Sequence, residues 1–294
     1  MNKVGFIGVG IMGKSMVRNL MKAGFELHIY ARTKSKVEDV ISEGAQFHES
    51  IKDCVQDCDA VITIVGFPQD VEEVYFDEGN ILDSAKKGAY LIDMTTTSPQ
   101  IAEKIYEEGT KRGFHVMDAP VTGGDTGAKA GTLSILVGGE KEDYEACMPL
   151  FEAMGTNINY QGKAGCGQHC KLANQIMIAG TLSGVCEALT YAKEQGLDPE
   201  VFMKSVATGA AGSKQFDTFG PKILKDDYAP GFFIKHFIKD MKLALIEANR
   251  KGLSLDVLSM VLANYEELEQ EGYGDLGTQA LMKFYDEEHR NTEE

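Results

Sequence analysis

The sequence predicts an α/β domain with a doubly wound parallel sheet, followed by a domain made only of helices. Two observations lead to this prediction. Between Lys3 and about Tyr160, short runs rich in β-branched residues alternate with amphipathic stretches, and strands that alternate with helices form a parallel sheet covered on both faces. After Gly167 the strand-like runs stop and helical patterns follow one another. We therefore expect one domain over residues 1–163 and a helical domain over residues 164–294, without internal repeats.

Each element is assigned from its own pattern. The expected strands of the first domain cover residues 4–7, 27–30, 60–65, 90–93, 115–118 and 134–137, and helices are expected over 12–23, 35–43 and 100–112. The helical domain is expected to begin with one long helix over 169–195 and to continue with helices over 200–207, 234–250, 256–270 and 278–288. The acidic end of the chain, residues 287–294, is expected to be a solvated tail.

The composition excludes several classes of partner. The chain has 45 acidic and 29 basic residues, a formal charge of −16, which repels phosphate backbones, so we expect no nucleic-acid partner. No apolar run reaches the ~18 residues that a membrane-spanning helix needs. The N-terminal apolar stretch is short and carries glycines where a signal peptide keeps its apolar core. We therefore expect a cytoplasmic protein without a membrane partner.

The six cysteines are expected to be small buried thiols and not a metal site. Cys54 and Cys58 form one i, i+4 pair, and Cys166 and Cys170 form another that encloses His169. A structural zinc site needs about four ligands and usually a tighter C-x-x-C knuckle, and both pairs fall in segments that read as helix. The expectation is therefore that the chain holds no metal.

The first motif is a dinucleotide-binding fingerprint. The first predicted strand runs directly into Gly8-Val9-Gly10-Ile11-Met12-Gly13, and a helix follows at once. In such a motif Gly8 makes the tight turn, Gly10 lets a pyrophosphate approach the backbone, and Gly13 lets the helix pack closely on the sheet. Ile11 and Met12 begin the helix, whose free N–H groups face the phosphates. We predict that these five residues bind the cofactor.

The end of the second predicted strand indicates which cofactor binds. An NAD site usually has Asp or Glu there to accept hydrogen bonds from the ribose. Here the strand ends in Ala31-Arg32-Thr33-Lys34, without a carboxylate, and Arg32 can form a charge-assisted fork with a 2′-phosphate. The alternative is that these basic residues only begin a solvated helix. We expect NADP, with NADPH preferred and NAD possible.

Two further segments carry chemistry. Thr122-Gly123-Gly124 offers a hydroxyl and consecutive unhindered N–H groups, which suit a small anion such as a carboxylate, although the same glycines could serve only to reverse the chain. Lys171 and Asn174 are three residues apart and share a face of the long predicted helix, which begins at the junction of the domains. A lysine held there could donate a proton, whereas an isolated helix lysine is usually solvated.

In their order and their separations along the chain, these motifs resemble those of the β-hydroxyacid dehydrogenase family. This family includes 3-hydroxyisobutyrate dehydrogenase, tartronate semialdehyde (2-hydroxy-3-oxopropionate) reductase and the short glyoxylate/succinic semialdehyde reductases. The resemblance rests on residues 5–13, 118–124, 165–174 and 239–240. It implies a Rossmann-type domain and a helical domain arranged as in 6-phosphogluconate dehydrogenase. It also implies a homodimer or homotetramer, and reversible hydride transfer between a nicotinamide and a short 3-hydroxy acid.

The resemblance also implies roles for individual residues. Lys171 matches the family's catalytic lysine, and Thr122, Gly123 and Gly124 match its substrate-carboxylate loop. Asn174 matches the first of two amides that usually follow the lysine. The remaining matches are cofactor contacts, namely Val65, Gly66, Thr96, Lys239 beside the nicotinamide, and Arg32 at the 2′-phosphate. The chain departs from the family pattern with Thr122 in place of Ser, Gln175 in place of a second Asn, and Val65-Gly66 in place of Leu-Pro.

The function expected from these residues is NADPH-dependent reduction of a small aldehyde that bears a carboxylate. The nearest alternative is a dehydrogenase of the 3-hydroxyisobutyrate type that works oxidatively with NAD(P). A decarboxylating 6-phosphogluconate enzyme needs a longer helical domain than residues 166–294 provide, and an imine reductase would not be expected to keep Lys171. A non-catalytic dinucleotide-binding module is the alternative from another class, and such relatives lose the lysine.

Overall fold

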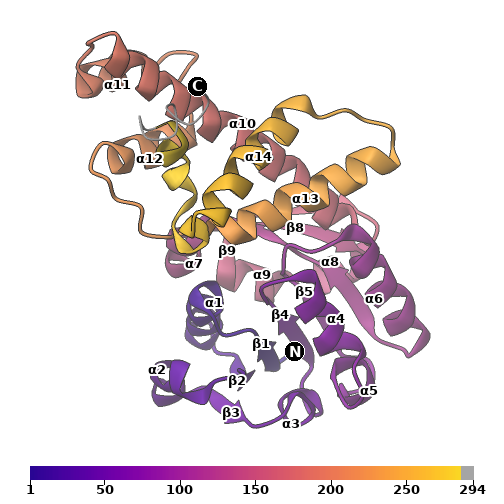
Figure 1. Ribbon diagram of the computed structural model, residues 1–294. Helices are drawn as coiled ribbons and strands as arrows, with labels where there is room; N and C mark the ends of the chain where they lie inside the picture. Colours follow the sequence, from indigo (N-terminus) through magenta and orange to yellow (C-terminus); the bar gives the residue numbers. More distant parts are fainter. Residues whose placement is uncertain (286–294) are drawn as a thin grey trace. The chain divides into compact units, whose positions relative to one another are not determined.

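The computed structural model describes residues 1–285, which form two compact units (Figure 1). The first unit runs from Met1 to Lys171 and the second begins at Leu172. The acidic tail expected over 287–294, and the end of the helix expected over 278–288, lie outside the described residues.

The first unit is built on one sheet, with the strand order β3-β2-β1-β4-β5-β6-β8-β7 and with β9 beside β8. The strands are β1 Lys3–Ile7, β2 Glu26–Tyr30, β3 Gln46–His48, β4 Ala60–Thr63, β5 Tyr90–Asp93, β6 His115–Asp118, β7 Val121–Thr122, β8 Leu133–Gly139 and β9 Gly155–Gly162. Strands β1 to β6 are parallel, and β8 runs antiparallel to β6 and β7. The strand order reverses direction at β1, and in doubly wound sheets ligands bind beside such a switch point, at the carboxyl ends of the strands.

All six expected strands are present, but the strand expected over 60–65 ends at Thr63. Strands β3, β7 and β9 were not expected. The carboxyl ends of the central strands are in register, because Ile7, Thr63, Asp93 and Asp118 pair in succession across the sheet. Side chains that follow these four residues therefore emerge along one edge of the sheet.

Helices cover both faces of this sheet. Successive strand residues alternate between the faces, so that Phe6, Ile29 and Ile62 join one buried cluster, whereas Ile7 and Val61 join the other. The first cluster includes residues of α1 Ile11–Lys22, α2 Glu38–Ser42, α7 Gly124–Ala130 and α9 Met148–Met154. The second includes residues of α3 Ile51–Val55, α4 Pro68–Phe76, α5 Ile81–Ser84 and α6 Pro99–Lys111. The remaining elements of this unit are the 3₁₀ turn η1 Lys34–Lys36 and the helix α8 Lys141–Ala146.

The second unit consists of helices. They are α10 Cys166–Glu194, which begins in the first unit, α11 Pro199–Val206, α12 Lys214–Ile223, α13 Ile234–Arg250, α14 Asp256–Gln270, and the 3₁₀ turns η2 Tyr273–Asp275 and η3 Thr278–Tyr285. The segment expected as an α-helix from residue 278 is therefore 3₁₀ as far as it is described. Its core includes Leu182, Phe237, Met241 and Tyr265.

The long helix α10 requires one correction. It is long and apolar enough to cross a membrane by length and composition, contrary to the expectation that no segment of the chain meets that test. Its side chains Leu172, Leu182, Cys186 and Leu189 are buried in the core of the helical unit. A core helix of a globular unit passes the same test, and these contacts give α10 that role.

Candidate active site

The glycine-rich turn after β1 is held by close backbone contacts. Gly8 has φ +98°, and a Cβ added to it would lie 2.1 Å from the carbonyl oxygen of Ile64. A Cβ on Gly13 would lie 2.1 Å from the oxygen of Gly8. A Cβ on Gly10, in contrast, would meet no atom within 4 Å. Packing therefore explains Gly8 and Gly13, and it leaves open space directly above the backbone of Gly10.

Helix α1 begins at this open space. Gly10 is its N-cap, the first intrahelical bond runs from the Lys14 amide to the Gly10 oxygen, and no side chain of the described residues caps this end. The first turn, which contains Ile11 and Met12, carries no acidic residue. A helix N-terminus of this kind presents free amides and a positive partial charge to an anion.

Arg32 follows β2 and pairs with an acidic residue. Its Nη1 lies 3.1 Å from Oδ1 of Asp70 in α4, and the Asp70 carboxylate also accepts from the Phe67 amide at 2.9 Å. The Arg32 side chain is 73% exposed, against 17% for Asp70. The guanidinium therefore keeps donors for a ligand, but it lies beside a carboxylate that was not expected from the sequence.

The loops after β4 and β5 are joined by hydrogen bonds. The Val65 amide donates to Oγ1 of Thr95 at 3.0 Å, and the Thr95 amide donates to Oδ1 of Asp93 at 3.1 Å. The Thr63 hydroxyl donates to the same Asp93 oxygen at 2.7 Å. Burial raises the pKa of the Asp93 carboxyl to about 6. Thr96 is half-buried in the same loop as Thr95, and Gly66 is half-buried beside Val65.

The first turn of α10 is fixed to the carboxyl edge of the sheet by Asp118 and Gln168. The Asp118 carboxylate accepts from the amides of Gly165 and Gln168, both at 2.8 Å. The Gln168 side chain accepts from the Thr97 amide at 2.9 Å and donates to the Thr95 oxygen at 2.7 Å. Burial raises the pKa of the Asp118 carboxyl, and its two amide bonds oppose this rise. Neither residue was predicted from the sequence to have a role in the site.

Lys171 lies one helical turn after Gln168. Its side chain is buried, with 7% of the residue exposed, whereas an ordinary surface lysine of a helix keeps its ammonium in water. The structure thus places the turn that carries Lys171 against the loop that contains Thr96, through Gln168.

The glycine loop after β6 forms a tight turn. Thr122 ends β7, Gly123 has φ +131° and Gly124 has φ +65°, and helix α7 begins at Gly124. These positive φ values favour glycine without reference to a ligand. Both glycines are exposed, so their backbone can be approached.

In the helical unit, four polar residues form a chain of contacts. The Asn174 side chain donates to Oε1 of Gln175 at 2.8 Å, and Gln175 donates to Oδ2 of Asp240 at 2.6 Å. The ammonium of Lys239 lies 2.8 Å from Oδ1 of Asp240. Gln175, a departure from the family pattern, thus connects Asn174 with the Lys239-Asp240 pair.

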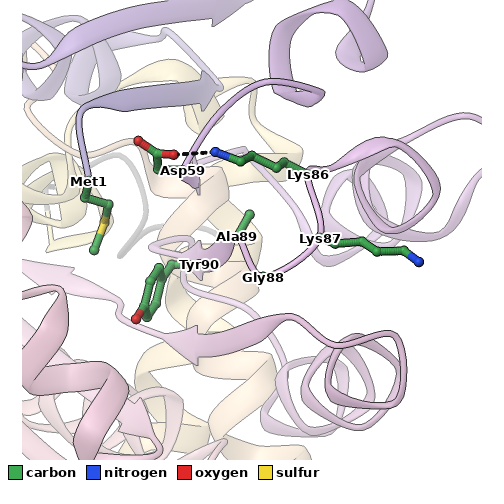
Figure 2. Close-up of a pocket in the computed structure, with 7 residues that line it drawn as sticks. All are labelled: Met1, Asp59, Lys86, Lys87, Gly88, Ala89 and Tyr90. Carbon is green, nitrogen blue, oxygen red and sulfur yellow. Dashed lines mark hydrogen bonds and ion pairs between the residues drawn. The ribbon is translucent and has the colours of Figure 1, made fainter.

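Other features of the first unit lie apart from this network. A surface pocket lined by Met1, Asp59, Lys86, Lys87, Gly88, Ala89 and Tyr90 lies at the amino ends of β1, β4 and β5, the opposite edge of the sheet from Gly8 (Figure 2). Lys86 is paired there with Asp59 at 2.8 Å, and Lys87 points away from the pocket. Among residues 1–285, no group of three His, Cys, Asp or Glu side chains is arranged to hold a metal.

Comparison with known proteins gives matches along the chain. The family model described as the NAD binding domain of 6-phosphogluconate dehydrogenase matches residues 3–162. A second model, described as NAD-binding of NADP-dependent 3-hydroxyisobutyrate dehydrogenase, matches residues 165–285.

Individual relatives and structures are similar over the same length. An uncharacterized oxidoreductase of Bacillus subtilis is 49% identical, covering 96% of this chain and 98% of the relative. The 2-hydroxy-3-oxopropionate reductase of Escherichia coli is 38% identical over 86% of each chain, and an NAD-dependent L-serine dehydrogenase of Pseudomonas aeruginosa is 33% identical over 97% and 98%. The structure of Mycobacterium tuberculosis 3-hydroxyisobutyrate dehydrogenase with L-serine superposes with a TM-score of 0.88, at 26% identity, covering 96% of this chain and 98% of that one.

Proposed function

Because the chain belongs to the β-hydroxyacid dehydrogenase family and is an NAD(P)-dependent oxidoreductase of hydroxy acids, we propose that it uses NADPH to reduce a small aldehyde that bears a carboxylate. The observation that carries the proposal is the hydrogen-bonded edge of the sheet. There the loops that contain Val65 and Thr96 are joined to the helix turn that carries Lys171.

The glycine-rich turn fits a dinucleotide. Gly8 and Gly13 are required by backbone packing, but Gly10 is not, and the space above it is where a pyrophosphate would approach. The N-terminus of α1, with the amides of Ile11 and Met12, would hold the phosphates. Val65, Gly66, Thr96 and Lys239 are proposed as further cofactor contacts. When bound, NADPH supplies a hydride to a carbonyl carbon.

Lys171 is proposed as the general acid. Reduction of an aldehyde places negative charge on its oxygen, and an ammonium there both stabilises that charge and donates the proton that completes the alcohol. Thr122, Gly123 and Gly124 are proposed to bind the substrate carboxylate through a hydroxyl and two backbone amides. Asn174, whose amide donates to Gln175, has a fixed side chain and is proposed to orient the substrate.

Arg32 supports NADPH as the preferred cofactor, since its guanidinium can pair with a 2′-phosphate. Its partner Asp70 weakens that argument, because a carboxylate 3.1 Å from Arg32 competes for the guanidinium and repels the 2′-phosphate of NADPH. Asp70 thereby supports the alternative, a dehydrogenase that works oxidatively with NAD(P). Dissociation constants for NADPH and NADH, measured on the same preparation, separate the two.

The substrate class is tested by comparing succinic semialdehyde with butyraldehyde, which has the same length but no carboxylate. With NADPH followed by absorbance, we expect a kcat/KM at least ~100-fold higher for the acid, because the anion-binding donors would be left unpaired by the neutral aldehyde. Equal values would contradict the carboxylate site. Thr122→Val should raise the KM for the acid, whereas Thr132→Val, the same change at an exposed position beyond the loop, should not.

A further inference from the structure

We propose that Gln168 is a positioning residue, which sets the place of Lys171 by clamping the first turn of α10 to the backbone on both sides of Thr96. This inference rests on the proposed function, in which Lys171 donates the proton and Thr96 contacts the cofactor. Gln168 is bonded to Thr95 and Thr97, the residues on either side of Thr96.

The Gln168 amide has only one possible orientation. Its side chain is fully buried, and its two polar atoms both contact the loop after β5. The Thr97 amide can only donate and the Thr95 carbonyl can only accept, so Oε1 must face Thr97 and Nε2 must face Thr95. One side chain therefore fixes two backbone groups that flank Thr96.

The helix side of the clamp is rigid. Asp118 accepts from the amides of Gly165 and Gln168, so the start of α10 is tied to the end of β6. A Cβ on Gly167 would lie 2.3 Å from the Leu136 oxygen, and a Cβ on Gly138 would lie 2.5 Å from Oδ1 of Asp118. The first turn of α10 therefore sits directly on β6 and β8, without space to shift toward them.

The loop side is equally constrained. Thr95 donates its amide to Asp93 and accepts from the Val65 amide with its hydroxyl. The loop that contains Thr96 is thus bonded to the end of β5, to the segment that follows β4 and to α10. A displacement of about 1 Å at a reacting group can cost about 100-fold in rate. Loss of the clamp should therefore reduce kcat, even though the reacting groups remain.

The decisive variant is Gln168→Glu. A carboxylate can accept from Thr97 but cannot donate to Thr95, whereas a protonated carboxyl reproduces both bonds. At pH 8 we expect kcat for succinic semialdehyde to fall tenfold to 100-fold. As the pH decreases, burial favours the protonated carboxyl, and the ratio of variant to wild-type kcat should rise. Gln195→Glu, the same change at an exposed position just after α10, should keep a ratio near one throughout.

A structural role alone predicts different results. If Gln168 serves only stability, the folded variant has the wild-type kcat at every pH, and the proposal is wrong. Gln168→Met, which keeps the volume but removes both bonds, should lose kcat without recovery at low pH. Should Gln168→Glu fail to fold, a wild-type kcat for Gln168→Met would equally overturn the proposal, and a reduced kcat in folded protein would support it.

A second readout separates this proposal from the proposed function. Lysines labelled by reductive ¹³C-methylation give NMR signals, and that of Lys171 is identified by its absence in Lys171→Arg. The clamp predicts that this signal shifts in Gln168→Glu and not in Gln195→Glu. If the Lys171 signal shifts in Gln168→Glu but the wild type reduces no semialdehyde, the role of Gln168 is supported and the proposed function is wrong. If the wild type is active and Gln168→Glu has an unchanged signal and an unchanged kcat, the proposed function is supported and the role of Gln168 is wrong.

Discussion

At the scale of single residues, Lys171 gives the most direct test of the chemistry. Lys171→Met keeps most of the buried side chain but removes the ammonium, so kcat should fall ~10²–10⁴-fold, the contribution typical of a general acid. The dissociation constant for NADPH should change little. Lys193→Met, at an exposed lysine of the same helix, is the control. A folded Lys171→Met enzyme that keeps more than a tenth of the wild-type turnover would rule out the proposed role.

Asp93 should leave a signature in the pH dependence of stability. Its pKa is raised to about 6 in the folded protein, above the unfolded value of about 3.9, so the folded state binds the proton more tightly. The protonated Asp93 carboxyl therefore contributes to the free energy of unfolding. This contribution is complete below the pKa of the unfolded chain and is lost as the pH rises through 6. From pH 5 to pH 8 the loss amounts to about 1.4 kcal/mol.

The measurement compares wild type with Asp93→Asn, whose amide does not titrate. Free energies of unfolding from urea titrations at pH 5 and pH 8 should show the wild type losing about 1.4 kcal/mol relative to the variant as the pH increases. A difference that is constant with pH, or one of opposite sign, would mean that Asp93 is ionised in the folded protein at pH 5.

Arg32 and Asp70 should have opposite effects on cofactor preference. Arg32→Glu removes the fork and adds repulsion, so NADPH should lose about 2–4 kcal/mol of binding while NADH loses little. Asp70→Asn should strengthen NADPH binding, because it frees the guanidinium and removes a negative charge 3.1 Å away. Titration of both variants with both cofactors tests this. A wild type that shows no preference for NADPH would already contradict the proposed use of Arg32.

At the scale of elements, the crossing of β6, β8 and α10 should tolerate no added side chain. In Gly138→Ala the new Cβ would lie 2.5 Å from Asp118 Oδ1 and 2.8 Å from the Gly167 nitrogen, so the first turn of α10 must move. We expect a loss of ~1–3 kcal/mol in the free energy of unfolding, and a lower kcat.

The matched control for Gly138→Ala is a glycine of α10 that has space around it. A Cβ at Gly184 meets no atom within 4 Å, so Gly184→Ala should stabilise the protein by about 0.5–1 kcal/mol through reduced backbone entropy of the unfolded chain. Similar stability of the two variants would mean that the crossing is looser than its contacts indicate.

Several of the elements that were not expected from the sequence carry little apolar signal in their patterns. Strand β9 alternates exposed polar residues such as Asn157 and Asn159, and β7 has only two residues. Helix α12 contains Gly220 and Pro221, which read as a loop although the helix continues through them. The buried strands β1, β4, β5 and β6 were predicted because their β-branched and aliphatic runs are set by burial on both faces.

The candidate site was predictable to the extent that local spacing defines it. Gly8, Gly10 and Gly13 follow from one turn between a strand and a helix, so six residues suffice to suggest them. Gln168 and Asp118 bond to partners that are 47 to 73 residues away along the chain, and no local pattern encodes such contacts. Asp70 was missed for the same reason, since its pairing with Arg32 depends on where α4 follows β4.

At the scale of the whole molecule, the helical unit presents an apolar surface. Three apolar side chains there are exposed: Met177 on α10 (71%), and Val257 (58%) and Met260 (51%) on α14. The two helices are close at this point, because a Cβ added to Gly180 of α10 would lie 3.7 Å from Val257. Neighbouring exposed apolar side chains of this kind commonly mark an interface between proteins. We expect a second copy of the chain to cover them, in line with the homodimer or homotetramer that the family resemblance implies.

Sedimentation equilibrium tests this expectation. The wild type should have a mass that is a multiple of 32.1 kDa, and Met177→Glu with Met260→Glu should give smaller species because charges are placed in the contact. Lys193→Met again serves as the control. A wild type that is monomeric at micromolar concentration would contradict the expectation.

The attachment of α10 also bears on how such proteins could be recombined. The two family matches meet between residues 162 and 165, which suggests a natural place to exchange one half for that of a relative. A crossover there would separate Asp118 from the amides that it caps, and Thr95 and Thr97 from Gln168. Chimeras that retain the native α10 turn up to Lys171 should fold and turn over more readily than those joined three residues before Gln168. The position at which halves of related chains can be joined without loss of function therefore lies inside α10, and not in the loop that precedes this helix.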